Sequence, residues 1–109
     1  MGDSNLVLIR KATFHFKKGK RDEAFAELDQ ILKKEARNTK GFRGFISMLS
    51  KDSENEALIL TLWEDELSFT MSETILLAPA MKRIFNTLEK EPYFENFKLY
   101  STEMYLGAR

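Results

Sequence analysis

Eight residues near the middle of the chain decide its fold: Ala57-Leu58-Ile59-Leu60-Thr61-Leu62-Trp63-Glu64. Apolar side chains occupy both alternating sets of this stretch, with three leucines in one set and an alanine, an isoleucine and a tryptophan in the other. Successive side chains of a β-strand point to opposite faces of the sheet. The stretch is therefore expected to be a strand whose two faces both need to be covered.

Three further strands are expected around this one. The segment from Asn5 to Phe16 is rich in β-branched and aromatic residues and also carries large aliphatic side chains in both alternating sets. A strand over residues 42–50 is joined to the central stretch by the polar segment 51–56, which favours a surface hairpin. The alternation after Pro92 predicts a last strand from Glu95 to about Leu106.

Two amphipathic helices separate these strands. The first follows an acidic start at residues 22 and 23, and its apolar residues recur at the spacing of one helix face: Ala24, Phe25, Leu28, Ile31, Leu32 and Ala36. Asp65 is expected to cap the second, with Leu67, Met71 and Ile75 on its inner face. Because proline lacks an N–H group, this helix must break or kink at Pro79 before continuing toward Lys90.

The element order βαββαβ predicts the fold class α+β, with a ferredoxin-like antiparallel sheet and both helices on one face, as a single domain over residues 1–109. Helices on one face leave the other apolar face bare. Such a face is larger than the few hundred Å² that soluble monomers expose. We therefore expect a homodimer whose two sheets pack face to face.

The composition excludes several kinds of site and partner. The chain has 109 residues, no cysteine, one histidine and zero net charge. Disulfides, thiolate metal sites and multi-histidine metal cages are excluded, and no metal is expected. Zero net charge argues against polyanions, so no nucleic acid partner is expected. No apolar stretch reaches the roughly 20 residues of a membrane span and the N-terminus carries no export signal, so we expect no membrane partner and a cytoplasmic location.

Two motifs in the chain are compared with known families. Lys40 to Met48 partly matches the aromatic strand of RNA-recognition domains, but it falls on the wrong strand. Gly41-Phe42-Arg43-Gly44-Phe45, followed after a hairpin by Leu60-Thr61-Leu62-Trp63-Glu64-Asp65-Glu66-Leu67-Ser68-Phe69, resembles the antibiotic biosynthesis monooxygenase family. The resemblance implies a dimeric α/β barrel. It also implies chemistry ranging over cofactor-free oxygenases of polycyclic aromatics, quinone-related oxidases, haem-degrading enzymes and an isomerase.

The functional residues of that family carry over poorly. Ser72 stands where many relatives place a histidine, Lys82 near the haem ligand position, and Ala12 near a first-strand asparagine. A lysine ammonium has no free lone pair, so haem degradation by that mechanism is not predicted and no cofactor is expected.

Two residues are candidates for catalysis. His15 could act as a general base, although a lone histidine at a strand end is more often a surface or interface residue. Arg10 stands in an apolar strand set, where it either pairs with a carboxylate such as Glu103 or binds an anionic ligand oxygen. The candidates for substrate binding are Arg10, Phe14, Trp63, Phe69, Ser72 and Tyr100.

The leading hypothesis is a small-molecule-binding protein that resembles cofactor-independent monooxygenases and acts on aromatic or quinone-like metabolites. The alternative is a non-catalytic dimeric module on the same fold, which binds a ligand or is associated with stress. A third hypothesis is an isomerase that uses Arg10 and a tyrosine.

Overall fold

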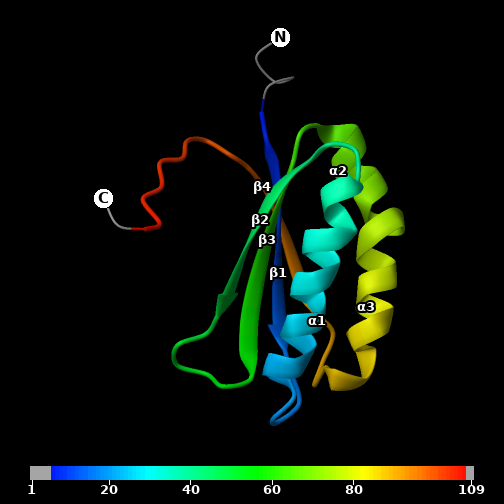
Figure 1. Ribbon diagram of the computed structural model, residues 1–109, viewed down its shortest axis with the longest axis vertical. Helices are drawn as coiled ribbons and strands as arrows, with labels where there is room; N and C mark the ends of the chain where they lie inside the picture. Colours follow the sequence, from blue (N-terminus) through cyan, green and yellow to red (C-terminus); the bar gives the residue numbers. More distant parts are fainter. Residues whose placement is uncertain (1–5, 108–109) are drawn as a thin grey trace.

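The computed structural model describes residues 6–107 and confirms the ferredoxin-like α+β fold. Four antiparallel strands form one sheet in the order β2-β3-β1-β4, with β1 at Leu8–His15, β2 at Phe42–Leu49, β3 at Glu56–Trp63 and β4 at Tyr93–Lys98. Figure 1 shows that the helices lie together on one side of this sheet. The two central strands, β1 and β3, both carry large apolar side chains on both faces.

The helical layer consists of α1 at Arg21–Lys34 and of a second, composite helix. The composite helix runs through α2 at Glu66–Ser72, a π-helical segment at Glu73–Leu77 and α3 at Ala78–Ile84. Short 3₁₀ turns at Ala36–Asn38 and Phe85–Thr87 follow the two helices. The Asp65 carboxylate accepts a hydrogen bond from the Ser68 N–H at 2.9 Å, which confirms the predicted cap of α2.

Pro79 lies in the first turn of α3, as its missing N–H predicts. The interruption that precedes it is the π-helical segment. There the Ala78 N–H donates to the Glu73 carbonyl, five residues back rather than four. The composite helix therefore continues past Pro79 with one wide turn instead of a break.

The core lies between the sheet and the helices. On β1, the side chains of Arg10, Ala12 and Phe14 are buried against the helices, whereas Ile9, Lys11 and Thr13 point to the opposite face. Register places Leu58, Leu60 and Leu62 of β3 beside these outward residues. The open face of the sheet is therefore largely apolar, and its polar members include the ion pair between Lys11 and Glu95 at 3.4 Å.

The predicted inner face of the second helix is wrong. Leu67, Met71 and Ile75 are exposed, and the buried residues are Phe69, Ser72, Leu76, Ala80 and Ile84. This set has the same three-and-four spacing but includes a serine, whose buried hydroxyl donates to the Phe69 carbonyl at 2.6 Å. The hydrogen bond satisfies the hydroxyl, so a polar residue occupies the core-facing row.

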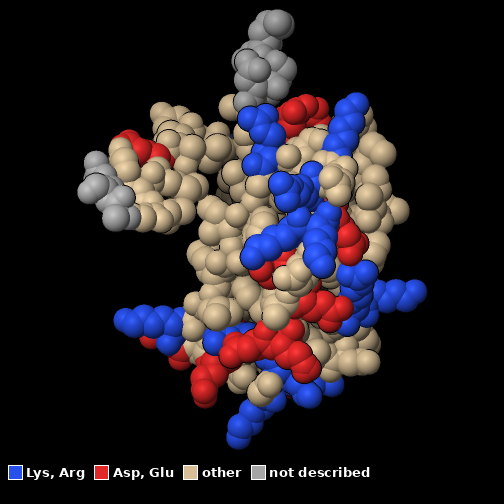
Figure 2. All heavy atoms as spheres, viewed as in Figure 1, with Lys and Arg blue, Asp and Glu red and all other residues tan. Residues whose placement is uncertain are grey.

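The last predicted strand is also wrong in its bounds. β4 ends at Lys98, which pairs with Leu8 at the beginning of β1, so the sheet offers no neighbouring strand beyond this point among the described residues. Residues 99–107 run as an irregular segment away from the body of the domain, which Figure 1 shows in orange and red. In the space-filling view of Figure 2 this segment is mostly uncharged, in contrast to the mixed charges over the rest of that surface.

Candidate functional site

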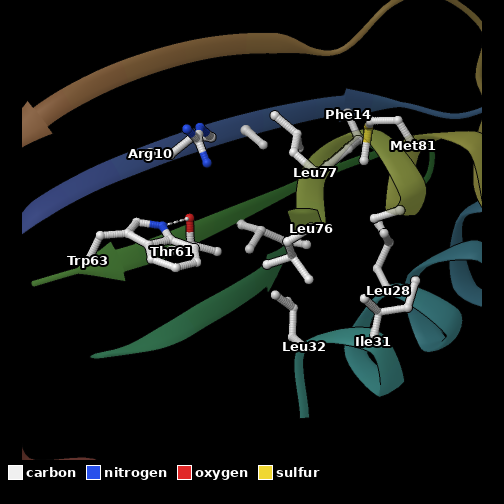
Figure 3. A pocket seen from close by; sticks show the side chains of 13 residues that line it. Arg10, Phe14, Leu28, Ile31, Leu32, Thr61, Trp63, Leu76, Leu77 and Met81 are labelled. Atoms are coloured by element: carbon white, nitrogen blue, oxygen red, sulfur yellow. Dashed lines mark hydrogen bonds between the residues drawn. The ribbon is translucent and has the colours of Figure 1, made fainter. Parts of the chain in front are cut away.

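A small cavity lies between the sheet and the helices (Figure 3). Its volume is about 50 Å³. The sheet contributes Arg10, Ala12, Phe14, Ile59, Thr61 and Trp63, and the helices contribute Leu28, Ile31, Leu32, Leu76, Leu77, Ala80 and Met81. Arg10 is the charged member of this lining, and most of the others are apolar.

Arg10 reaches the cavity from the middle of β1. Its guanidinium donates to the Ser72 hydroxyl at 2.8 Å, to the Phe69 carbonyl at 3.1 Å and to the Glu73 carboxylate at 3.5 Å. It also lies over the Phe69 ring, 4.3 Å from the ring centroid. These contacts all come from the end of α2 and the first residue of the π-helical segment.

The surroundings of the guanidinium leave part of its capacity unused. An arginine has five N–H donors, and three bonds are formed with residues 6–107. The Arg10 side chain is 6% exposed, whereas that of Glu73 is 58% exposed. Burial lowers the pKa of Arg10 from its ordinary value, and the charge of Glu73 opposes this shift. An incompletely bonded cation at an apolar cavity favours a ligand with an anionic or strongly accepting oxygen.

Two aromatic side chains, Trp63 and Phe14, contribute to the sheet side of the cavity. Trp63 is fully buried, and its indole N–H donates to the Thr61 hydroxyl at 3.0 Å. Phe14 is also buried and packs against Phe16 in a stacked arrangement. The indole donor is therefore already satisfied, so Trp63 and Phe14 offer flat apolar surface rather than a free polar group.

The structure brings five of the sequence-predicted site residues together. Arg10, Phe14 and Trp63 line the cavity, and Phe69 and Ser72 hold the Arg10 guanidinium. These residues come from β1, β3 and α2, and the sheet register pairs Arg10 with Thr61 across the two central strands. The predicted cluster therefore forms around Arg10.

The other two predicted site residues lie elsewhere. Tyr100 is 99% exposed in the irregular segment after β4, because the strand that was to carry it ends at Lys98. His15 alternates away from Phe14 and lies on the open face of the sheet, with its Nε2 3.9 Å from a carboxylate oxygen of Glu56. A role for either residue in this cavity would require a different arrangement of the chain.

The predicted structural partner of Arg10 is wrong. The carboxylate beside Arg10 belongs to Glu73, whereas Glu103 accepts a hydrogen bond from the Tyr105 hydroxyl in the C-terminal segment. Sequence reasoning also missed Leu77 as a cavity residue. Glu73 could have been identified from the sequence, because it directly follows Ser72, which the family pattern had already placed near the site.

The described residues contain neither a metal-binding cluster nor a membrane-spanning helix. Within residues 6–107, no three His, Asp or Glu side chains form a group that could hold a metal ion. No helix in the same part of the chain is both long and apolar enough to cross a membrane.

The comparisons with known proteins agree with this architecture. Residues 8–73 match the sequence profile of the family described as antibiotic biosynthesis monooxygenase. No curated protein matches the chain.

The solved structures that resemble the chain share its fold at low sequence identity. A Nitrosomonas europaea protein of unknown function superposes with a TM-score of 0.77 at 16% identity, over 94% of this chain and 97% of its own. A Caulobacter crescentus protein, provisionally named an antibiotic biosynthesis monooxygenase, gives 0.76 at 17% identity, over 89% and 92%. Since the profile match spans β1 to the start of the π-helical segment and includes both sides of the Arg10 cluster, this chain belongs to the antibiotic biosynthesis monooxygenase family.

Proposed function

We propose that this protein binds an aromatic or quinone-like metabolite between its sheet and its helices and oxidises it with molecular oxygen, without a cofactor. The observation that carries the proposal is Arg10, a buried cation with unused donors at the edge of an otherwise largely apolar cavity. A guanidinium in this position stabilises the ionised form of a phenol or enol, and the flat faces of Phe14 and Trp63 suit its ring.

The chemistry that such a site supports is balanced without a bound metal or flavin. The bound hydroxyl loses its proton to solvent, and the resulting anion transfers one electron to O₂. Recombination of the two radicals forms a C–O bond to a ring carbon that carries a hydrogen and gives a peroxide anion. The peroxide anion takes up a proton from solvent and loses water, made from its outer oxygen, that proton and the hydrogen of the ring carbon, which leaves a carbonyl. One oxygen atom enters the substrate, the other leaves in water, and the substrate loses two hydrogens. The protein supplies a dry cavity and a fixed positive charge.

We also propose that the functional unit is a homodimer. Members of this family are typically dimeric. The open face of the sheet supports the same state for this chain, because Ile9, Leu58, Leu60 and Leu62 lie on it side by side without a covering helix. The partner is then a second copy of the same chain, with the two sheets face to face.

The experiment is oxygen uptake with a panel of anthrones, naphthols and quinols, measured for the wild type and for Arg10→Met. Arg43→Met is the matched control, because Arg43 is an exposed arginine of β2 whose ion pair with Glu64 lies outside the cavity. We expect one O₂ consumed per substrate oxidised, loss of turnover in Arg10→Met, and wild-type turnover in Arg43→Met. Turnover that persists in Arg10→Met would contradict the role of Arg10.

A second function, that of a non-catalytic ligand-binding module, is favoured by one observation. Among the described residues, none that lines the cavity is a histidine or carboxylate that could take a proton, since His15 lies on the open face and Ser72 is engaged with Arg10. Ligand binding that depends on Arg10, without any oxygen consumption, would establish this function in place of oxidation.

A further inference from the structure

A second hollow lies beside the cavity, between the end of the composite helix and β4. It is an open groove of about 790 Å³. Its apolar lining residues are Met81, Phe85, Leu88, Pro92 and Phe94, and its polar ones are Lys17, Asn86, Glu89, Lys90 and Glu91. Two phenyl rings in this lining are accessible to a ligand, since Phe85 is 70% and Phe94 is 37% exposed.

Met81 is the described residue that lines both the groove and the cavity. It lies in α3 and is half-buried, and Figure 3 shows its side chain near Phe14, on the other side of the view from Arg10. A methionine side chain is unbranched and has three rotatable bonds, so it repacks at little cost. One flexible side chain therefore stands between the enclosed space at Arg10 and the open groove.

The volumes of the cavity and the groove show why the position of Met81 affects the size of the ligand. A cavity of roughly 150 Å³ is known to hold one benzene molecule, and the cavity at Arg10 measures about 50 Å³. A single aromatic ring bound to Arg10 does not fit without a movement of the lining. The groove, at about 790 Å³, falls in the range of drug-sized ligand sites.

We propose that the cavity and the groove are two compartments of one binding site, and that Met81 is the movable partition that determines the size of the ligand. This inference rests on the proposed function, because Arg10 anchors the ligand oxygen. When Met81 turns aside, a fused aromatic anion extends from Arg10 past α3 onto the exposed rings of Phe85 and Phe94. The preferred ligand class is then a two- or three-ring oxyanion rather than a single-ring phenolate.

Affinity should consequently rise with the number of rings. Each added ring transfers apolar surface from water to the groove, which corresponds to about a tenfold gain in affinity. The test uses three carboxylates as probes: benzoate, 2-naphthoate and anthracene-2-carboxylate. Binding is measured by titration calorimetry on the full-length protein, with folding of each variant checked by urea unfolding.

Four variants separate the contributions. Met81→Ala removes the partition and should raise affinity for all three probes, because even a single ring requires the lining to move, with the largest gain, about tenfold, for anthracene-2-carboxylate. Phe85→Ala, on an exposed side chain whose loss does not threaten folding, should weaken only the two larger probes. Met71→Ala is the control, because Met71 is a half-exposed methionine of α2 that lines neither compartment. Arg10→Met should weaken all three probes alike.

The outcomes distinguish the two proposals. Loss of all three probes in Arg10→Met, combined with wild-type ring dependence in Met81→Ala and Phe85→Ala, overturns the partition and leaves the anion site standing. Equal affinity of the wild type for all three probes also overturns the partition. Failure of the wild type to bind any probe, or binding that is indifferent to Arg10→Met, overturns the proposed function and the partition with it.

Discussion

Replacing Arg10 by methionine should change the stability of the fold by no more than about 1.5 kcal/mol, even though Arg10 is one of the most buried charged residues in the chain. Removing one partner of a buried ion pair usually costs 3–5 kcal/mol, because it strands the other charge in the interior. Here the other charge belongs to Glu73, whose side chain is more than half exposed and remains hydrated after the substitution.

The remaining contacts of Arg10 lead to the same expectation. The Phe69 carbonyl still accepts a hydrogen bond from Ser72 at 2.6 Å when the guanidinium is gone, so neither group is left without a partner. The lost hydrogen bonds and the lost contact with the Phe69 ring amount to about 3–5 kcal/mol. Relief of the desolvation of a buried cation returns several kcal/mol. The two contributions nearly cancel.

Urea unfolding at fixed protein concentration measures this change, with the fluorescence of Trp63, the sole tryptophan, as the probe. We expect the midpoint of Arg10→Met within about 1 M urea of the wild type, and the exposed-site control Arg43→Met closer still. A loss above about 3 kcal/mol with an unchanged slope would refute the reasoning. It would mean that Arg10 serves to hold the second helix against the sheet rather than to bind a ligand.

Three further predictions concern the sheet face, two turns and a helix cap. Leu60→Asp, at the centre of the open face, should convert the proposed dimer to monomer at micromolar concentration in sedimentation, whereas Leu67→Asp on an exposed helical surface should not. Dimers in both variants would exclude this face as the interface. In urea unfolding, Gly41→Ala should destabilise the fold by at least about 2 kcal/mol, whereas Gly19→Ala should destabilise it by about 1 kcal/mol. Both glycines have a positive φ, but only at position 41 would an added Cβ overlap a neighbouring serine of α2. The hydrogen bonds that α2 donates to Asp65 lower the pKa of its carboxyl. Its contribution to stability is therefore fully present above the ordinary pKa of aspartate, near 3.9, and is lost as the pH falls through the lowered folded-state value. Asp65→Ala should flatten the pH dependence of stability below about pH 4, and an unchanged acid slope would contradict this assignment.

The parts of the fold that could be predicted are those in which local pattern and tertiary environment agree. The central strands carry apolar residues in both alternating sets, and the structure places them in the middle of the sheet. The cap at Asp65 and the first-turn position of Pro79 follow from backbone chemistry that needs no tertiary information. The same local signals made the family pattern recognisable around Trp63.

The register of the second helix could not be predicted because it depends on a pairing between distant residues. Ser72 occupies a core-facing position in which its hydroxyl donates to the Phe69 carbonyl and accepts from Arg10, 62 residues earlier in the chain. Hydrophobicity alone favours Leu67, Met71 and Ile75 for that face, and the structure exposes all three. The length of the last strand could not be predicted for a related reason. Its two sets of side chains continue to alternate in the sequence after the neighbouring strand, β1, has ended.

The pairing of Arg10 with Ser72 also explains why the cavity lies beside the second helix. The wide turn at Glu73–Leu77 begins directly after Ser72 and ends just before Pro79, so it joins the residues that hold Arg10 to the residues that close the cavity. Because a π-helical turn contains an extra residue, both Leu76 and Leu77 contribute to the lining, and Met81 follows one turn later. A regular helix through this segment would rotate either Glu73 away from Arg10 or Met81 away from the groove. The anchor at one end of the proposed site and the partition at the other are therefore connected through the wide turn that precedes Pro79.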